Sequence, residues 1–361
     1  MFDNNELTMP THEKNLIDQR QRYHPVQFDK VLVVGLGQLG LPVAKYVKER
    51  GFDTYGYDIS AKAMDRAEKI EGIKKATSFS EFDICILCVS THKPEDMFSP
   101  QIDSLLSIAD RISREAKDGA LVSIESTIPK GTSNKVFEIL NHRLHVVHAP
   151  HRWYALEEKE HGVNQLRVIG GLCDCCLRLG VQFYDSSYAC NSEKKVESYP
   201  RSSSLSSNSS IKSLGIPMHP VTEIEIAEIT KVVENAHRYL QIAFAEELYL
   251  YCQANNINFP ELRDALNTKW NVNILEPREG IGGHCLPKDT KMFLHSSSSP
   301  SISKRSKILT AAMEVDQHYR KYRQSRCVGN NDYEDSSSGT QITTIDDIQN
   351  PGFNNRGQYC E

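Results

Sequence analysis

The feature that most constrains this chain is a glycine-rich turn set between an apolar strand and a helix. Residues 29–59 read DKVLVVGLGQLGLPVAKYVKERGFDTYGYDI, which the apolar and glycine pattern predicts as strand, turn, helix and second strand. A G-x-G-x-x-G motif is a weak signal alone, but this context makes it a strong indication of dinucleotide binding, with an ordinary glycine turn as the alternative. The loop consists of Gly35, Leu36, Gly37, Gln38, Leu39 and Gly40.

Polar residues follow two of the predicted strands on the same edge. Asp58 ends the strand DTYGYD, where a carboxylate accepts hydrogen bonds from both ribose hydroxyls and repels a 2′-phosphate, so we expect NAD rather than NADP. Ser90 and Thr91 end the strand CILCVST, and ligands of open parallel sheets bind at this carboxyl edge. We therefore include both in the cofactor site.

Further apolar runs set the fold class. FDICILCVST, GALVSIEST, LHVVHAP and LRVIGG alternate with helical segments such as 99–117, which predicts a doubly wound parallel, Rossmann-like α/β sheet. A long amphipathic helix over 223–256 and another over 307–326 predict an all-α domain after it. We expect a polar leader at 1–26, the NAD-binding domain at 27–184, a disordered serine-rich insertion at 185–213, the helical domain at 214–328 and a disordered tail at 329–361.

The charge balance argues against two classes of partner. The 361 residues include 42 Lys and Arg against 47 Asp and Glu, a formal net charge of −5, so no global basic field points to nucleic acid or an anionic membrane. No apolar run approaches the roughly 20 residues of a membrane span, and the polar opening lacks a signal-peptide core, so we expect a cytoplasmic protein.

The ten cysteines are expected to be mostly free thiols. Two groups have spacings that suggest metal: C-x-C-C at Cys173, Cys175 and Cys176, and C-x-x-C at Cys85 and Cys88. Neither has the matching second pair of a zinc ribbon, so we expect core or near-surface thiols and no metal.

The decapeptide GIGGHCLPKD, residues 280–289, contains a candidate nucleophile. Its glycines allow close backbone approach to a ligand, and Pro287 suits the first turn of a helix, which would place Cys285 at a positive helix end that favours the thiolate. A buried structural cysteine beside a turn is equally compatible with these ten residues.

Lys231 and Asn235 lie four residues apart on the long helix and therefore share one face. Beside a pocket they would hold a developing oxyanion and a water, although both residue types are ordinary on a solvated helix surface. The flanking apolar residues predict the packed side of this helix: Ile226, Ile229, Val232, Val233 and Leu240.

Four motifs taken together resemble the UDP-glucose/GDP-mannose dehydrogenase family, closest to its UDP-N-acetyl-mannosamine dehydrogenase branch. They are GLGQLGLPVA, ESTIPKGT, EITKVVENAHRYLQIAFAEEL and GIGGHCLPKD, in matching order, and the resemblance covers residues 28–183 and 214–325. It implies NAD-dependent oxidation of a nucleotide sugar, most simply a UDP-sugar, twice at C6, from alcohol through aldehyde to carboxylate. It also implies a homodimer formed through the long helix.

The resemblance implies a role for each matching residue. Cys285 looks like the nucleophile that forms a thiohemiacetal and then a thioester, Lys231 and Asn235 like the pair that stabilises the oxyanion and positions water, and Asp289 like the proton-transfer carboxylate. Thr127 resembles the threonine that touches nicotinamide and catalytic water, and Lys288 a cofactor contact. The implied substrate site comprises His151, Arg152, Lys231, Asn235, the run Ile274–Arg278 and Gly282.

The chain departs from the family pattern in two places. Ala149-Pro150-His151 stands where the family usually has Ser-Pro-Glu or Cys-Pro-Glu, so His151 replaces the expected glutamate, with Glu157 and Glu158 as nearby alternatives. The family's third, nucleotide-binding α/β domain has no recognisable counterpart, since the chain turns polar after about residue 328.

Two other functions are compatible with these residues. The first is a one-step NAD dehydrogenase of a small hydroxy acid, in which Lys231 does the acid–base work. The second is a catalytically impaired NAD-binding or scaffold protein derived from the family. Two NADH per substrate would support the nucleotide-sugar dehydrogenase and one the hydroxy-acid dehydrogenase, whereas NAD binding without turnover would favour the scaffold protein.

Overall fold

The computed structural model describes residues 26–93, 95–153, 162–185, 212–283, 285–295 and 306–329. Most of the predicted leader, serine-rich insertion and tail lies outside these residues. Glu157 and Glu158 also lie outside them.

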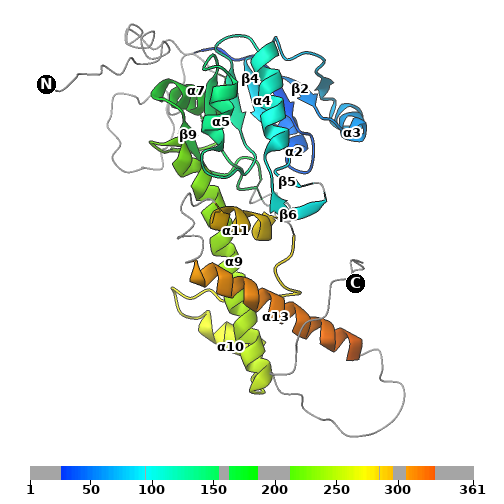
Figure 1. Ribbon diagram of the computed structural model, residues 1–361, viewed down its shortest axis with the longest axis vertical. Coiled ribbons are helices and arrows are strands. Elements are labelled where there is room, and N and C mark those ends of the chain that lie inside the picture. The colour runs from blue at the N-terminus through cyan, green and yellow to red at the C-terminus, as the bar shows by residue number, and fades with distance from the viewer. Residues whose placement is uncertain are drawn as a thin grey trace, which may run out of the picture.

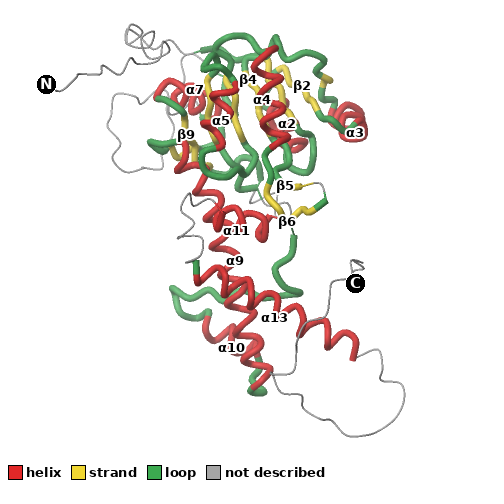
Figure 2. The backbone as a smooth tube through the Cα atoms, in the orientation of Figure 1, coloured by secondary structure: helices red, strands yellow, loops and turns green. Residues whose placement is uncertain are grey.

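An eight-stranded sheet forms the first half of the molecule (Figures 1 and 2). Its order is β10-β9-β8-β7-β4-β1-β2-β3, and neighbouring strands are parallel except for β8 and β9, which run antiparallel. The strands are β1 (Lys30–Val34), β2 (Asp53–Tyr57), β3 (Lys74–Lys75), β4 (Ile84–Leu87), β7 (Leu121–Ile124), β8 (His145–His148), β9 (Arg167–Gly171) and β10 (Met218–Pro220).

Helices cover both faces of this sheet, so it has two cores. Alternate residues of β1 face opposite sides: Val31 and Val33 join one core, and Leu32 and Val34 the other. The first core packs under α2 (Gly40–Glu49), α3 (Ala61–Glu71) and α7 (Asp174–Tyr184), and the second under α4 (Asp103–Glu115) and α5 (Thr132–Ile139). The predicted doubly wound, Rossmann-like α/β fold is confirmed, although the predicted parallel sheet contains one antiparallel pair, β8 and β9.

The second half of the structure is helical, as predicted. α9 (Ile224–Ala254) leaves the sheet, and α10 (Phe259–Leu266), α11 (Cys285–His295) and α13 (Lys307–Gly329) follow it, with α11 and α13 packing across α9 (Figure 1). A short hairpin of β5 (His92–Lys93) and β6 (Asp96–Pro100) contacts α11. Within the described ranges, no helix combines the length and apolar character required to traverse a bilayer.

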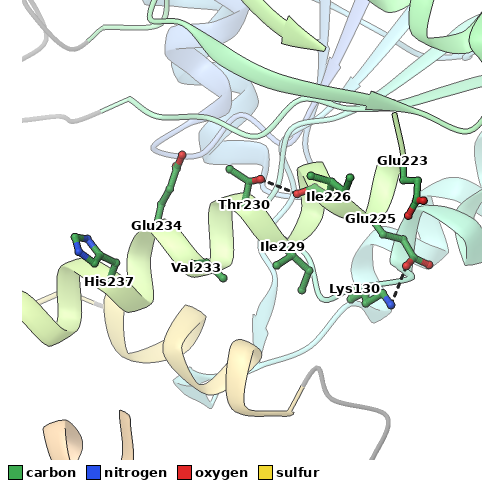
Figure 3. A pocket seen from close by; sticks show the side chains of 9 residues that line it. All are labelled: Lys130, Glu223, Glu225, Ile226, Ile229, Thr230, Val233, Glu234 and His237. Carbon is green, nitrogen blue, oxygen red and sulfur yellow. Dashed lines mark hydrogen bonds and ion pairs between the residues drawn. The ribbon is translucent and has the colours of Figure 1, made fainter. Parts of the chain in front are cut away.

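The packed side of α9 agrees only in part with the predicted one: Val232 is fully buried and Leu240 packs against the helical core, as predicted, but Ile226 and Val233 are not packed. Its buried stripe consists largely of small residues and one tyrosine, including Ala236, Tyr239 and Ala243, because the crossing helices approach closely there. Ile226 and Val233, predicted to be packed, are 43% and 39% exposed. Together with Ile229, these two residues line a pocket on a different face of α9 from the buried stripe (Figure 3).

Candidate active site

The glycine loop between β1 and α2 has the geometry of a dinucleotide cradle. Gly35 has φ +87°, and its N–H donates to the carbonyl of Tyr57 at 2.8 Å. A Cβ on Gly40 would lie 1.7 Å from the Gly35 oxygen, so only glycine allows α2 to start this close to β1. A Cβ on Gly37 would meet nothing within 4 Å, which leaves this backbone open to a ligand. Gln38 is exposed beside it, and Leu39 is the N-cap of α2.

Asp58 lies beside this loop, directly after β2. Its Oδ2 accepts a hydrogen bond from the Leu36 N–H at 2.7 Å, and its Oδ1 accepts one from the Ser60 N–H at 2.8 Å. These hydrogen bonds hold the Asp58 carboxylate against the glycine turn. The loop and the carboxylate therefore fit a dinucleotide with a free ribose 2′-hydroxyl.

Two threonines link this sheet edge to α11. Thr91 is buried; its Oγ1 donates to the carbonyl of Thr127 at 2.8 Å and accepts from Lys288 Nζ at 3.1 Å. Ser90 is exposed instead, and its hydroxyl pairs with His92 at 2.8 Å. The structure thus joins Thr91, Thr127 and Lys288 in one chain of contacts.

The same chain of contacts continues to α9. Lys288 Nζ forms an ion pair with Asp289 Oδ1 at 2.8 Å, and both side chains are buried. Asn235 Nδ2 donates to Asp289 Oδ2, and Lys231 Nζ donates to Asn235 Oδ1 at 3.5 Å. Four residues predicted from the sequence therefore form one polar cluster between two helices.

Cys285 begins α11 beside this cluster and is exposed. The six other cysteines whose burial is described are buried or half-buried: Cys85, Cys88, Cys173, Cys175, Cys176 and Cys252. A buried structural thiol is therefore excluded. Partial desolvation and the charge of Asp289 raise the pKa of Cys285, while Lys288 and Lys231 lower it. The net shift is upward, which corrects the prediction that the helix end favours a thiolate: the thiol needs a proton acceptor.

Lys231 differs from a solvated helix lysine. Burial lowers the pKa of Lys231, and the opposing charges of Glu234, Asp289 and Cys285 only partly restore it. A less basic ammonium transfers its proton more readily, which suits a group that must respond to charge forming on a substrate.

A buried carboxylate that the sequence prediction missed lies behind the site. Glu125 Oε1 forms an ion pair with Arg167 at 3.1 Å and accepts a hydrogen bond from Tyr184, while Oε2 lies against the His151 ring. Burial disfavours the charge, yet Arg167 and His151 lower the pKa of Glu125 to about 2. Burial and Arg167 lower the pKa of His151 to about 4, so this ring is neutral at neutral pH. The sequence offered one sign of this buried carboxylate, a glutamate at the end of the apolar run GALVSIE.

His151 and Arg152 occupy different environments. The His151 side chain is turned into the Glu125 network and is 5% exposed, so its substrate role stays a prediction. Arg152 bonds to Glu234 on α9 and to the Leu166 carbonyl, and its charge acts on Lys231. Arg152 therefore lies on the same side of α9 as the cluster.

The predicted sugar loop is held by the other helices. Ile274 exchanges two hydrogen bonds with the Asn267 side chain after α10, at 2.6 and 3.0 Å. The carbonyl of Arg278 accepts from Tyr319 of α13 at 2.6 Å, and Gly282 is exposed with open space where a Cβ would lie. The loop leads towards Cys285, and these hydrogen bonds tie it to the residue after α10 and to α13.

A second unpredicted glutamate docks α9 onto the sheet domain. Glu228 is fully buried and accepts the N–H of Gly131 at 2.6 Å and of Ser133 at 2.7 Å, at the start of α5. A carboxylate at a helix N-terminus satisfies N–H groups that have no partner within the helix. Because Lys231 lies one turn further along α9, this contact sets its position.

The glycine loop, the carboxylate after β2 and the attached helical domain define an NAD-dependent dehydrogenase. Residues 68–187 match the NAD binding domain of the UDP-glucose/GDP-mannose dehydrogenase family, and residues 225–318 match its central domain. The chain belongs to this family, and its cofactor is NAD.

Its relatives include several nucleotide-sugar dehydrogenases. The UDP-N-acetyl-D-mannosamine dehydrogenase of Methanococcus maripaludis is 26% identical over 324 residues, which cover 84% of this chain and 68% of the relative. That of Campylobacter jejuni is 28% identical over 324 residues, covering 80% and 72%. The solved UDP-D-ManNAc dehydrogenase of Pyrococcus horikoshii shares the fold, with a TM-score of 0.66, 23% identity, and coverage of 83% and 71%.

Proposed function

We propose that this protein oxidises the C6 alcohol of a UDP-sugar to a carboxylate in two steps, with Cys285 holding the intermediate. The observation that carries the proposal is the continuous set of contacts from Thr127 and Thr91 through Lys288 and Asp289 to Asn235, with Cys285 at its side. These contacts join the cofactor edge of the sheet to the helix that carries the acid–base groups.

The cofactor is held by the glycine loop and by Asp58. When bound, NAD supplies the hydride acceptor for both oxidations. The open backbone at Gly37 would receive the pyrophosphate and Asp58 the ribose hydroxyls. The remaining proposed cofactor contacts come from Thr127, which follows β7, and from Lys288 on α11.

The chain's own residues divide the remaining chemistry. The Cys285 sulfur adds to the aldehyde carbon, its proton passing to Asp289, whose charge already acts on that thiol. Lys231 and the Asn235 amide donate to the oxygen that gains charge as the sulfur–carbon bond forms. After the second oxidation the sulfur carries a thioester, and water held by the same pair attacks it and releases the carboxylate and the thiol.

The substrate class is proposed from the relatives and from the loop before Cys285. Relatives that act on UDP-N-acetyl-D-mannosamine make this sugar the first to test. Arg152, the run Ile274–Arg278 and Gly282 are the proposed sugar contacts, together with His151, which stands in the sequence at the place of the family glutamate.

Counting NADH against sugar tests the proposal. Purified protein is incubated with excess NAD and limiting UDP-N-acetylmannosamine, UDP-glucose or a small hydroxy acid, with Cys252→Ser as a control because Cys252 is buried in α9. We expect two NADH per UDP-sugar, and loss of the second oxidation in Cys285→Ser. One NADH per hydroxy acid would support the one-step alternative, and NAD binding without turnover would support a scaffold protein.

A further inference from the structure

A cluster of three cysteines and one histidine lies at the other end of the sheet's strands from the proposed active site. Cys173, Cys175 and Cys176 stand at the start of α7, and His145 is the first residue of β8. The active-site residues follow the carboxyl ends of β4 and β7, whereas this cluster lies where β8 begins. The backbone bond from Leu172 N to the Val146 oxygen, 3.2 Å long, brings the two segments together.

Three of the four ligand atoms, those of His145, Cys175 and Cys176, form one group, and the Cys173 sulfur lies against its two sulfurs. Cys173 Sγ lies 2.7 Å from Cys175 Sγ and 3.2 Å from Cys176 Sγ. His145 Nδ1 lies 3.7 Å from Cys175 Sγ and 3.5 Å from Cys176 Sγ, and these three ligand atoms all lie within 4.8 Å of one another. Two segments far apart in the chain thus bring four soft or borderline ligands together.

These separations can be compared with a tetrahedral zinc site. Zinc–sulfur bonds of about 2.3 Å and zinc–nitrogen bonds of about 2.0–2.1 Å place neighbouring ligands about 3.8 Å apart for two sulfurs and about 3.6 Å for sulfur and nitrogen. Both sulfur–nitrogen distances agree with this geometry. The sulfur–sulfur distances are shorter, so Cys173 would move outward by rotating its side chain when a metal enters.

The start of α7 suits a thiolate ligand at Cys173. The backbone N–H of Cys176 donates to Cys173 Sγ at 3.4 Å, as expected at a helix N-terminus.

We propose that Cys173, Cys175, Cys176 and His145 form a structural site for a soft divalent metal, with Zn²⁺ as its natural occupant. Three thiols lose their protons to solvent when the metal binds, and neutral His145 supplies the fourth ligand, which leaves a net charge of −1 on the centre. Three thiolates and an imidazole favour zinc over magnesium or calcium. The metal would fasten the start of α7 to the start of β8 and takes no part in the oxidation.

Cobalt titration under reducing conditions tests the site directly. Co²⁺ bound by thiolates in a tetrahedral site shows intense visible bands and sulfur-to-metal charge transfer, and we expect these to saturate at one metal per chain. Excess Zn²⁺ should bleach them. Zinc should also raise the melting temperature of the purified full chain.

Matched variants locate the signal. Cys173→Ser keeps a good helix N-cap, and His145→Gln removes the ligand from β8. Each variant should weaken cobalt binding by more than roughly 10-fold. Losing a residue that only supports a metal ligand already costs about that much affinity, and losing a ligand itself should cost more. Cys252→Ser and Cys285→Ser should retain the full spectrum, which separates this site from binding at the exposed thiol.

Three results would overturn the proposal. The first is a spectrum without tetrahedral bands in the reduced wild-type chain. The second is a spectrum that survives in both Cys173→Ser and His145→Gln, with circular dichroism and NAD binding showing that each variant is folded. The third is peptide mass spectrometry showing a disulfide among Cys173, Cys175 and Cys176 that persists after reduction and blocks metal uptake.

Discussion

Asn235 on α9 donates a hydrogen bond from Nδ2 to Oδ2 of Asp289 on α11, and this bond joins two helices at the point where Cys285 begins the second one. The bond orients Asp289 so that its other oxygen meets Lys288 at 2.8 Å. The carboxylate is therefore held in place between an amide, an ammonium and the thiol whose pKa it raises.

Replacing this carboxylate has opposite effects on thiol ionisation and on turnover. Asp289→Asn removes the negative charge that raises the pKa of Cys285, so alkylation of Cys285 by iodoacetamide should move to lower pH. Turnover should fall, because the proposed proton acceptor is lost. The rate of labelling is followed by peptide mass spectrometry over a range of pH.

Cys85 serves as the internal control for that measurement. It is fully buried, and burial raises its pKa to about 12, so it should label far more slowly than exposed Cys285 in both proteins. Bound UDP-sugar should protect Cys285. Equal labelling of the two cysteines, or an unchanged pH profile in Asp289→Asn, would contradict the site geometry.

Asp58 should decide between the two nicotinamide cofactors. Its fixed carboxylate repels a 2′-phosphate, so the wild type should bind NAD much more tightly than NADP. Asp58→Ala should narrow that gap by roughly 10-fold, which corresponds to about 1.4 kcal/mol. Titration calorimetry measures both affinities, and equal binding of NADP by the wild type would refute the argument.

The exposed stripe of α9 predicts a homodimer. Val233, Phe244 and Tyr251 are 39%, 56% and 57% exposed and recur at near-helical spacing along the face that carries Ile226, next to the pocket of Figure 3. A second copy of the same helix offers a matching apolar face.

Light scattering at micromolar concentration should therefore give the mass of a dimer. Phe244→Asp combined with Val233→Asp should shift it towards monomer, because two charges would be buried at the contact. The exposed Ile70 on α3 provides the control, since Ile70→Asp should leave the mass unchanged. A monomeric wild type would count against the prediction.

Stability should fall on mild acidification. Burial lowers the pKa of His148 to about 3 and, with Arg167, that of His151 to about 4, so the unfolded chain binds more protons than the folded one below about pH 6.5. Each ring should reduce the free energy of unfolding by up to about 1.4 kcal/mol per pH unit from there downward.

Glu125 causes a second loss of stability at lower pH. Its folded pKa of about 2 lies below the ordinary value of 4.5, so its contribution is present above about pH 4.5 and disappears towards pH 2. Urea unfolding between pH 7 and 4 measures the first effect, and His148→Phe should make it shallower. An equally steep dependence in that variant would show that His148 does not contribute.

Local patterns in the sequence determined much of this protein. The glycine loop, the apolar β-strands and the long helix are encoded within single segments, since strand and helix periods and the backbone freedom of glycine act over a few residues. Local motifs also singled out Cys285, Lys231 and Asn235. The family resemblance added Asp289 and the roles of all four, and the structure brings these four together.

Only the tertiary structure decided what surrounds those residues. Burial of Glu125 beside Arg167, the docking of Glu228 onto α5 and the upward pKa shift of Cys285 depend on charges and desolvation contributed by distant segments. The same holds for His145, which the pairing of β8 with β9 brings to the cysteines of α7. The spacing of residues along the chain does not predict such contacts, because they form only when separate elements pack together.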